Sequence, residues 1–86
     1  MALFFFHTET DHRVTDIEGT EFPSYIEARA EGIRTAGQMM QDVPEIFWGS
    51  RPWSVSVTNA DGLIMWEIHL DGQTSPAGRS LEPAST

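Results

Sequence analysis

The 86-residue chain contains no cysteine and no lysine. Without cysteine, neither a disulfide framework nor a thiolate metal site contributes to its stability. A domain of this size is near the lower limit at which one apolar core suffices, so burial of apolar side chains has to supply the stability. The absence of cysteine suits a reducing compartment, and we expect a cytoplasmic protein.

Long apolar runs are also missing. No stretch approaches the roughly 18 apolar residues that a membrane span requires. The opening segment, "MALFFFHTET", has a short apolar run, no basic residues before it and acidic residues soon after, which is not the pattern of a secretory signal peptide. We therefore expect a soluble protein with no membrane partner.

Basic residues are few. Thirteen acidic residues oppose five basic ones, and the formal net charge is -8. This charge repels phosphate backbones at long range, and the arginines are scattered rather than clustered. Nucleic-acid binding is therefore disfavoured. The bases are Arg13, Arg29, Arg34, Arg51 and Arg79.

The residues that are present predict a folded α+β domain. Hydrophobic residues make up 40% of the chain, too many for a disordered one. The run "LFFFH" at residues 3–7 predicts a buried strand, and "RVTDI" at residues 13–17 predicts a short second strand in a hairpin. "WSVSVTNADGLIMWEIHL" at residues 53–70 alternates about the turn "NADG" and predicts a second hairpin.

An acidic stretch, "DIEGTEFPSYIEARAEG", separates the first hairpin from a helix. Gly19 permits a positive φ, Pro23 ends a strand, and Ser24 with Glu27 matches a capping box. The stretch therefore predicts a turn and a helix start. It does not match the ligand spacing of a calcium loop.

Two stripes run along the predicted helix of residues 24–42. The larger residues suggest that the first stripe is buried, and it consists of Ile26, Ala30, Ile33, Gly37 and Met40. The second stripe, Ala28, Gly32 and Ala36, is interpreted either as a contact with another helix or a second protomer, or as simple tolerance of a poor helix former.

Between helix and second hairpin lies the unusually apolar connection "DVPEIFWGSRP". Its side chains Ile46, Phe47 and Trp48 are expected to cap one end of the core. The alternative is that Phe47 and Trp48 are exposed as a binding anchor.

These elements predict a ββαββ domain over residues 1–70, with three to four antiparallel strands and one helix packed on one face. Residues 71–86 are expected to form a flexible tail. On the second hairpin, Trp53, Val55 and Val57 with Ile64, Trp66, Ile68 and Leu70 are predicted to face the helix. The opposite face then carries an uncovered apolar patch of Leu3, Phe5, Leu63 and Met65.

Candidate chemistry is sparse. His7 and His69 lie on the uncovered face if the first and last strands pair, and Glu67 precedes His69 by two residues. Imidazole and carboxylate together are metal ligands, so His7, His69 and Glu67 are an alternative metal site. Because neither a nucleophile pattern nor a phosphate loop is present, we expect no enzyme and no cofactor.

Several phrases resemble a family of short bacterial proteins that is frequent in alphaproteobacteria, domain of unknown function 6894. The family has motifs like Y-F-F-H, D-x-E-G-x-x-x-P, E-A-R-x-E-A and V-x-D-x-D-G-x-x-L, and the resemblance covers about residues 3–70. The matching residues are Phe5, Phe6, His7, Asp16, Glu18, Gly19, Pro23, Glu27, Ala28, Arg29, Val57, Asp61, Gly62 and Leu63. Gly32 and Asn59 depart from the pattern. The resemblance implies fold and provenance but no reaction.

Taken together, the sequence favours a non-enzymatic, homodimeric protein-interaction module, with itself and an unknown protein as partners. The candidate interaction surface is Leu3, Phe5, His7, Phe47, Trp48, Leu63 and Met65. Two alternatives stay open. One is a small-ligand or metal-binding protein, and the other is an antitoxin-like regulatory component, which rests on size and layout alone.

Overall fold

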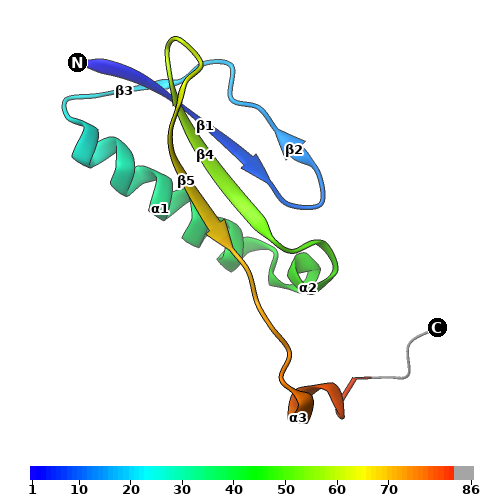
Figure 1. Ribbon diagram of the computed structural model, residues 1–86. Coiled ribbons are helices and arrows are strands. Elements are labelled where there is room, and N and C mark those ends of the chain that lie inside the picture. The colour runs from blue at the N-terminus through cyan, green and yellow to red at the C-terminus, as the bar shows by residue number, and fades with distance from the viewer. Residues whose placement is uncertain (83–86) are drawn as a thin grey trace.

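Figure 1 shows the computed structural model, a sheet with one long helix against one face. The structure describes residues 1–82. The elements follow one another as β1 (Ala2–Glu9), β2 (Arg13–Val14), β3 (Thr20–Phe22), α1 (Tyr25–Asp42), the 3-10 turn η1 (Pro44–Ile46), α2 (Phe47–Ser50), β4 (Trp53–Asn59), β5 (Ile64–Leu70) and α3 (Pro76–Arg79).

All strand pairs are antiparallel, and the main order across the sheet is β2-β1-β4-β5. The short strand β3 pairs with the first residues of β1, on the edge where β2 pairs with its last residues. The α+β class and the ββαββ layout are confirmed. The sheet has five strands rather than three to four, because "TEF" at residues 20–22 forms a strand where a turn was expected.

The helix α1 begins and ends where its sequence signals place it. Ser24 is the N-cap, and its Oγ accepts a hydrogen bond from the backbone N–H of Glu27 at 3.4 Å. Asp42 is the last residue, because Pro44 disfavours a helical conformation at the residue before it. None of the helices within residues 1–82 combines the length and apolar character needed to cross a bilayer.

The predicted buried stripe of α1 is wrong, and the other stripe faces the sheet. Ala28, Gly32 and Ala36 are buried, whereas Ile26 and Ile33 are more than half exposed. The interpretation of Ala28, Gly32 and Ala36 as a contact with another protomer is therefore also wrong. The reason lies in the sheet, whose inner face already fills the core with large side chains. The sheet residues of the core cluster and its packed neighbours are Phe4, Phe6, Phe22, Val55, Val57, Trp66, Ile68 and Leu70.

The helix approaches the sheet closely at Gly32. A Cβ placed on this residue would lie 3.1 Å from both Val57 Cγ2 of β4 and Ile68 Cδ1 of β5. Small residues on α1 therefore let the helix lie against the branched and aromatic side chains of the sheet, which is how large and small residues combine in a dense core.

The hairpin of β4 and β5 is present, but one predicted core residue is wrong. Val55 pairs with Ile68 and Val57 pairs with Trp66, so these residues share the inner face. A bulge follows, and Thr58 then pairs with Ile64. Since an extra residue reverses the alternation, Ile64 lies on the open face and is 58% exposed.

The segment predicted as a tail begins beyond β5. Its residues 71–82 include the short helix α3, which lies apart from the sheet in Figure 1. Residues 83–86 of that predicted tail lie outside the described part of the chain.

Gly32→Val is expected to destabilise the fold by about 1–3 kcal/mol, because the added methyl groups collide with Val57 and Ile68. Gly37→Ala is the matched control. No atom lies within 4 Å of a Cβ at that position, so the change is expected to stabilise the helix by about 0.5–1 kcal/mol. Urea unfolding measures both. Equal effects of the two substitutions would contradict this packing.

Candidate functional site

The acidic turn after β2 is organised around one carboxylate. Asp16 Oδ1 accepts hydrogen bonds from the backbone N–H groups of Glu18 at 3.0 Å and Gly19 at 3.1 Å, and Oδ2 accepts one from Phe6 N–H at 3.1 Å. Strand β1 has partners on this edge at both ends but not at Phe6. The carboxylate of Asp16 therefore takes the place of a strand partner in the gap between β2 and β3.

His7 completes the same network. Its Nδ1 accepts a hydrogen bond from the backbone N–H of Asp16 at 3.1 Å, and its Nε2 lies 3.1 Å from Thr58 Oγ1. A nitrogen that accepts from an amide carries no proton, so in the neutral ring Nε2 carries it and donates to the hydroxyl of Thr58. Both ring nitrogens of His7 are thus used within the chain, and Thr58, on the open face of β4, is buried.

The open face of the sheet is partly covered by its own chain. Gly19 has φ of +75°, and a Cβ on it would lie 2.9 Å from the ring of Phe5. The turn of residues 16–19 therefore lies against Phe5. Leu3 and Phe5 are half-buried, as is His7, so the expectation of an uncovered apolar patch is corrected for Leu3 and Phe5.

The alternative metal ligands lie on two strands, His7 on β1 and Glu67 and His69 on β5. His7 pairs with Ser56 of β4, and Ser56 pairs with Glu67 of β5, so two strand spacings of about 4.8 Å each separate them. His69 Nε2 lies 3.7 Å from Glu67 Oε1. Strand β4 lies between β1 and β5, which contradicts the pairing that the hypothesis needed. Within residues 1–82, no three His, Asp or Glu side chains come together as a metal-binding group.

The pKa of Asp16 is shifted by opposing effects. Burial raises the pKa of this carboxyl group, but the backbone N–H groups of Gly19, Phe6 and Glu18 bind its charged form and outweigh the burial. The net result is a pKa below the usual 3.8. Asp16 is consequently a charged structural anchor, and its pKa is shifted away from the range of a proton donor near neutral pH.

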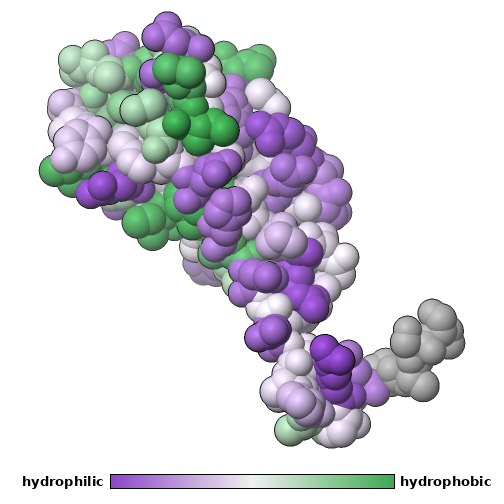
Figure 2. All heavy atoms as spheres, viewed as in Figure 1, coloured by the Kyte–Doolittle hydropathy of each residue, from purple (hydrophilic) through white to green (hydrophobic). Residues whose placement is uncertain are grey.

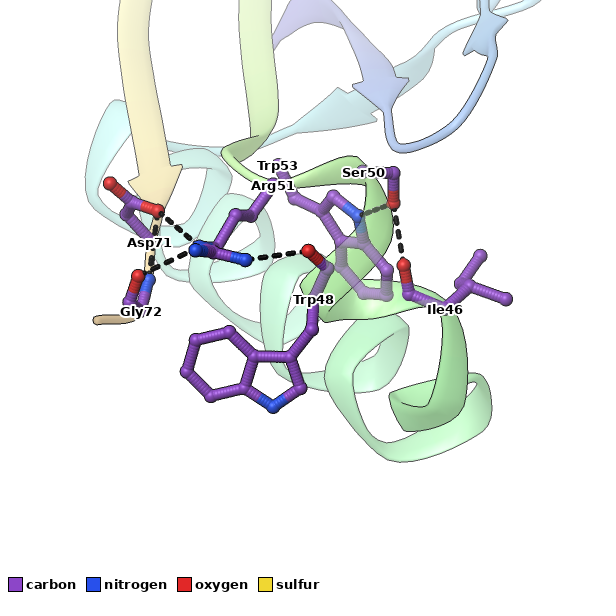
Figure 3. A network of polar contacts seen from close by, with 7 residues as sticks. All are labelled: Ile46, Trp48, Ser50, Arg51, Trp53, Asp71 and Gly72. Atoms are coloured by element: carbon purple, nitrogen blue, oxygen red, sulfur yellow. Dashed lines mark hydrogen bonds and ion pairs between the residues drawn. The ribbon is translucent and has the colours of Figure 1, made fainter. Parts of the chain in front are cut away.

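The two aromatic residues of the connection separate. Phe47 is buried, with its ring centroid 5.1 Å from that of Trp53, so its role as a cap on the core is seen in the structure. Trp48 is 52% exposed. Figure 3 shows how Ser50 supports this corner: its Oγ accepts from Trp53 Nε1 and donates to the carbonyl of Ile46, both at 2.8 Å.

Arg51 joins α2 to the end of β5. Its Nε donates to the carbonyl of Gly72 at 2.9 Å, its Nη1 donates to the carbonyl of Trp48, and its guanidinium lies 4.7 Å from the centre of the Trp48 ring (Figure 3). Beside them is an open hollow of about 640 Å³, lined by Trp48, Arg51, Thr74, Arg79 and Glu82. Its rim combines two bases with an acid and selects no single ligand charge.

The remaining predicted surface residues lie at the β4–β5 turn. Leu63 and Met65 are 62% and 46% exposed. The side chain of Asn59 shapes this turn, since its Oδ1 accepts from the backbone N–H groups of Asp61 and Leu63. Polar side chains at the turn therefore hold the backbone, while apolar ones face solvent.

Two residues of these networks were not found by sequence reasoning. Thr58 looked like an outward-facing strand residue, and Arg51 like one scattered base. Neither carries a local signal, because the contacts of Thr58 with His7 and of Arg51 with Gly72 join residues 51 and 21 apart in the chain. Only the long-range pairing of β1 with β4, and of α2 with the end of β5, brings the groups together.

The fold and its Asp16–His7 network define a small antiparallel α+β domain in which the motif residues brace the sheet. Residues 3–71 match the family described as domain of unknown function DUF6894, and the chain belongs to that family. No curated protein and no solved structure matches the chain. The match confirms the family expected from the motifs, which include His7, Asp16 and Gly19.

Asp16→Asn is expected to cost about 2 kcal/mol of stability at pH 7, since it removes a charge that accepts three amide hydrogen bonds. The pKa of Asp16 is lower in the folded than in the unfolded chain, so its contribution is present above pH 4 and is lost as the pH falls through the folded pKa. Unfolding free energies measured from pH 7 to pH 2 should therefore converge for the variant and the natural chain. Asp61→Asn, on the exposed β4–β5 turn, is the control. A stability difference that persists at pH 2 would contradict this assignment.

Arg51→Ala is expected to destabilise the domain by about 1–2 kcal/mol through the loss of its hydrogen bonds to Gly72 and Trp48. Arg34→Ala removes an arginine whose partner Glu31 is on the exposed helix surface, and should change stability by less than about 0.5 kcal/mol. Hydrogen exchange at residues 71–73 and the fluorescence of the tryptophans monitor the corner. Unchanged exchange in Arg51→Ala would show that this contact does not hold the segment.

Proposed function

We propose that the protein is a non-enzymatic, cytoplasmic protein-interaction module that acts as a homodimer. The observation that carries this proposal is the amount of apolar side chain left at the surface of so small a domain. The most exposed large apolar residues of the helix, the connection and the second hairpin are Ile26 (57%), Ile33 (60%), Met40 (38%), Trp48 (52%), Leu63 (62%), Ile64 (58%) and Met65 (46%).

These residues are not scattered singly. In Figure 2, apolar residues gather along α1 and around the turn between β4 and β5. Apolar groups of this kind at the surface are typical of protein–protein interaction sites, because leaving them in water is unfavourable. A second copy of the chain is the simplest partner, since most soluble oligomers are symmetric homo-oligomers.

The family motif supports a structural role for its polar residues. Asp16 binds three backbone N–H groups, and His7 uses both ring nitrogens within the chain. Groups that are occupied in this way brace the sheet and offer no free acid or base to a substrate. The alternatives of a metal or small-ligand protein using His7, His69 and Glu67, and of an antitoxin-like component, gain no contact in residues 1–82 that favours them.

Sedimentation equilibrium of the purified chain is expected to give the mass of two 9.6-kDa protomers, with dissociation on dilution. Thermal melts should then shift upward with protein concentration, because a dimer that forms only from folded chains is stabilised by mass action. A strict monomer at every concentration, with no concentration dependence of the melt, would remove the homodimer.

A further inference from the structure

We propose that two copies of the chain join their sheets edge to edge through β5, with the two α1 helices packed antiparallel across the seam. The inference rests on the proposed self-association and names its surface. Two features meet on the same side of the molecule: the open edge of the sheet and an apolar flank of the helix.

The first feature is the edge strand. β5 pairs with β4 alone, so the backbone N–H and C=O groups along its other edge have no strand partner within residues 1–82. Such an edge is a template for another strand. Natural proteins protect exposed strand edges from pairing with lysine, proline or inward-pointing charges. The inner face of β5, "IMWEIHL", carries none of these residues. Its one irregularity is the bulge before Trp66.

The second feature is the flank of α1. Successive helix residues turn by about 100°, so with Gly32 towards the sheet, the stripe of Ile26, Ala30, Ile33, Gly37 and Met40 lies to one side. Tyr25 stacks on Trp66 of β5, with ring centroids 6.4 Å apart. The helix α1 is right-handed and runs antiparallel to β4, and β5 lies beside β4 (Figure 1). The stripe therefore lies on the β5 side. Figure 2 shows apolar residues along α1 beside that edge.

The spacing of helices and strands fits such a seam. A Cβ at Gly32 would touch both Val57 of β4 and Ile68 of β5, so α1 lies over the boundary between these strands. Strands are about 4.8 Å apart, and a two-fold axis beyond β5 then places the two helix axes about 10 Å apart. Packed helices are separated by about 8–10 Å.

The stripe is complementary to itself when the helices are antiparallel. Its residues recur at spacings of four and three, the pattern of a helix seam. With the two-fold axis next to Gly32, Ile33 lies opposite Ala30 of the second copy and Ile26 lies opposite Gly37. Ile33 and Ile26 then each meet a small residue of the second copy.

The same axis gives a favourable register to the strands. Ile68 lies beneath Gly32, so β5 pairs with itself about Ile68. On the inner face, Trp66 then lies opposite Leu70 of the second copy. On the open face, Glu67 lies opposite His69 of the second copy, and a carboxylate and an imidazole can form a hydrogen bond across the seam. Helix and strand therefore agree on one symmetric arrangement without any change in the fold.

Ile33→Glu tests the helix part of the seam. Ile33 is exposed in the single chain, so the variant should fold normally, yet its charge would be buried in the dimer. We expect the dissociation constant of the dimer to increase at least about 100-fold. Ile17→Glu, at a more exposed apolar site on the turn before β3, is the control and should leave the dimer unchanged.

His69→Glu tests the strand part, because it places acids opposite one another along the seam. The expected result is weaker association, and adding Glu67→Lys should restore it by recreating opposite charges. The side chains of His69 and Glu67 are largely exposed in the single chain, so the substitutions should not prevent folding. Circular dichroism and sedimentation are measured on each variant.

The outcomes separate the two proposals. A natural chain that is dimeric, together with Ile33→Glu and His69→Glu variants that stay dimeric, would overturn this seam and leave the homodimer standing. A natural chain that is monomeric at every concentration overturns both. Loss of the dimer in both variants, with rescue by Glu67→Lys, supports the β5–α1 seam.

Discussion

The close approach of α1 to the sheet is the constraint on which the rest of the structure depends. Ala28, Gly32 and Ala36 are small enough for the helix backbone to lie on Val57 and Ile68. Dispersion contacts and burial are then supplied by the large side chains of the sheet. Because the small stripe is used inside, the larger apolar residues of the helix are left on its flank. The surface that the protein has available for a partner is thus a consequence of how its core is filled.

The edge of the sheet beyond β1 is held by a different device. Here two short strands leave a gap, and the carboxylate of Asp16 fills it by accepting the N–H of Phe6. The same residue orients His7, which in turn reaches Thr58 of β4. A polar network that spans three segments of the chain can specify one arrangement of a small sheet when every member has a partner. This network explains physically why the motif contains Asp16 and His7, residue types that in the sequence alone resemble a metal or acid–base site.

The two edges of the sheet differ accordingly. At the β1 edge, β2, β3 and the Asp16 turn occupy the backbone groups and cover Phe5. At the β5 edge, no strand of the described chain does so, and the apolar flank of α1 adjoins it. A fold that closes one edge with its own turn and leaves the other open beside apolar side chains is suited to symmetric pairing through the open edge. The proposed dimer is therefore an extension of the same sheet.

Local signals in the sequence were enough to determine the helix and the second hairpin. Ser24 and Pro44 mark the ends of α1, and alternation about "NADG" marks β4 and β5, because capping, proline geometry and strand periodicity act between near neighbours. Tertiary structure alone decided which stripe of α1 is buried, since both stripes have helical spacing and the choice depends on the volume that Trp66, Ile68 and Val57 already fill. It also decided the face of Ile64, which a bulge reversed, and the roles of His7, Thr58 and Arg51. These depend on contacts between residues far apart in the chain, for which no local pattern exists.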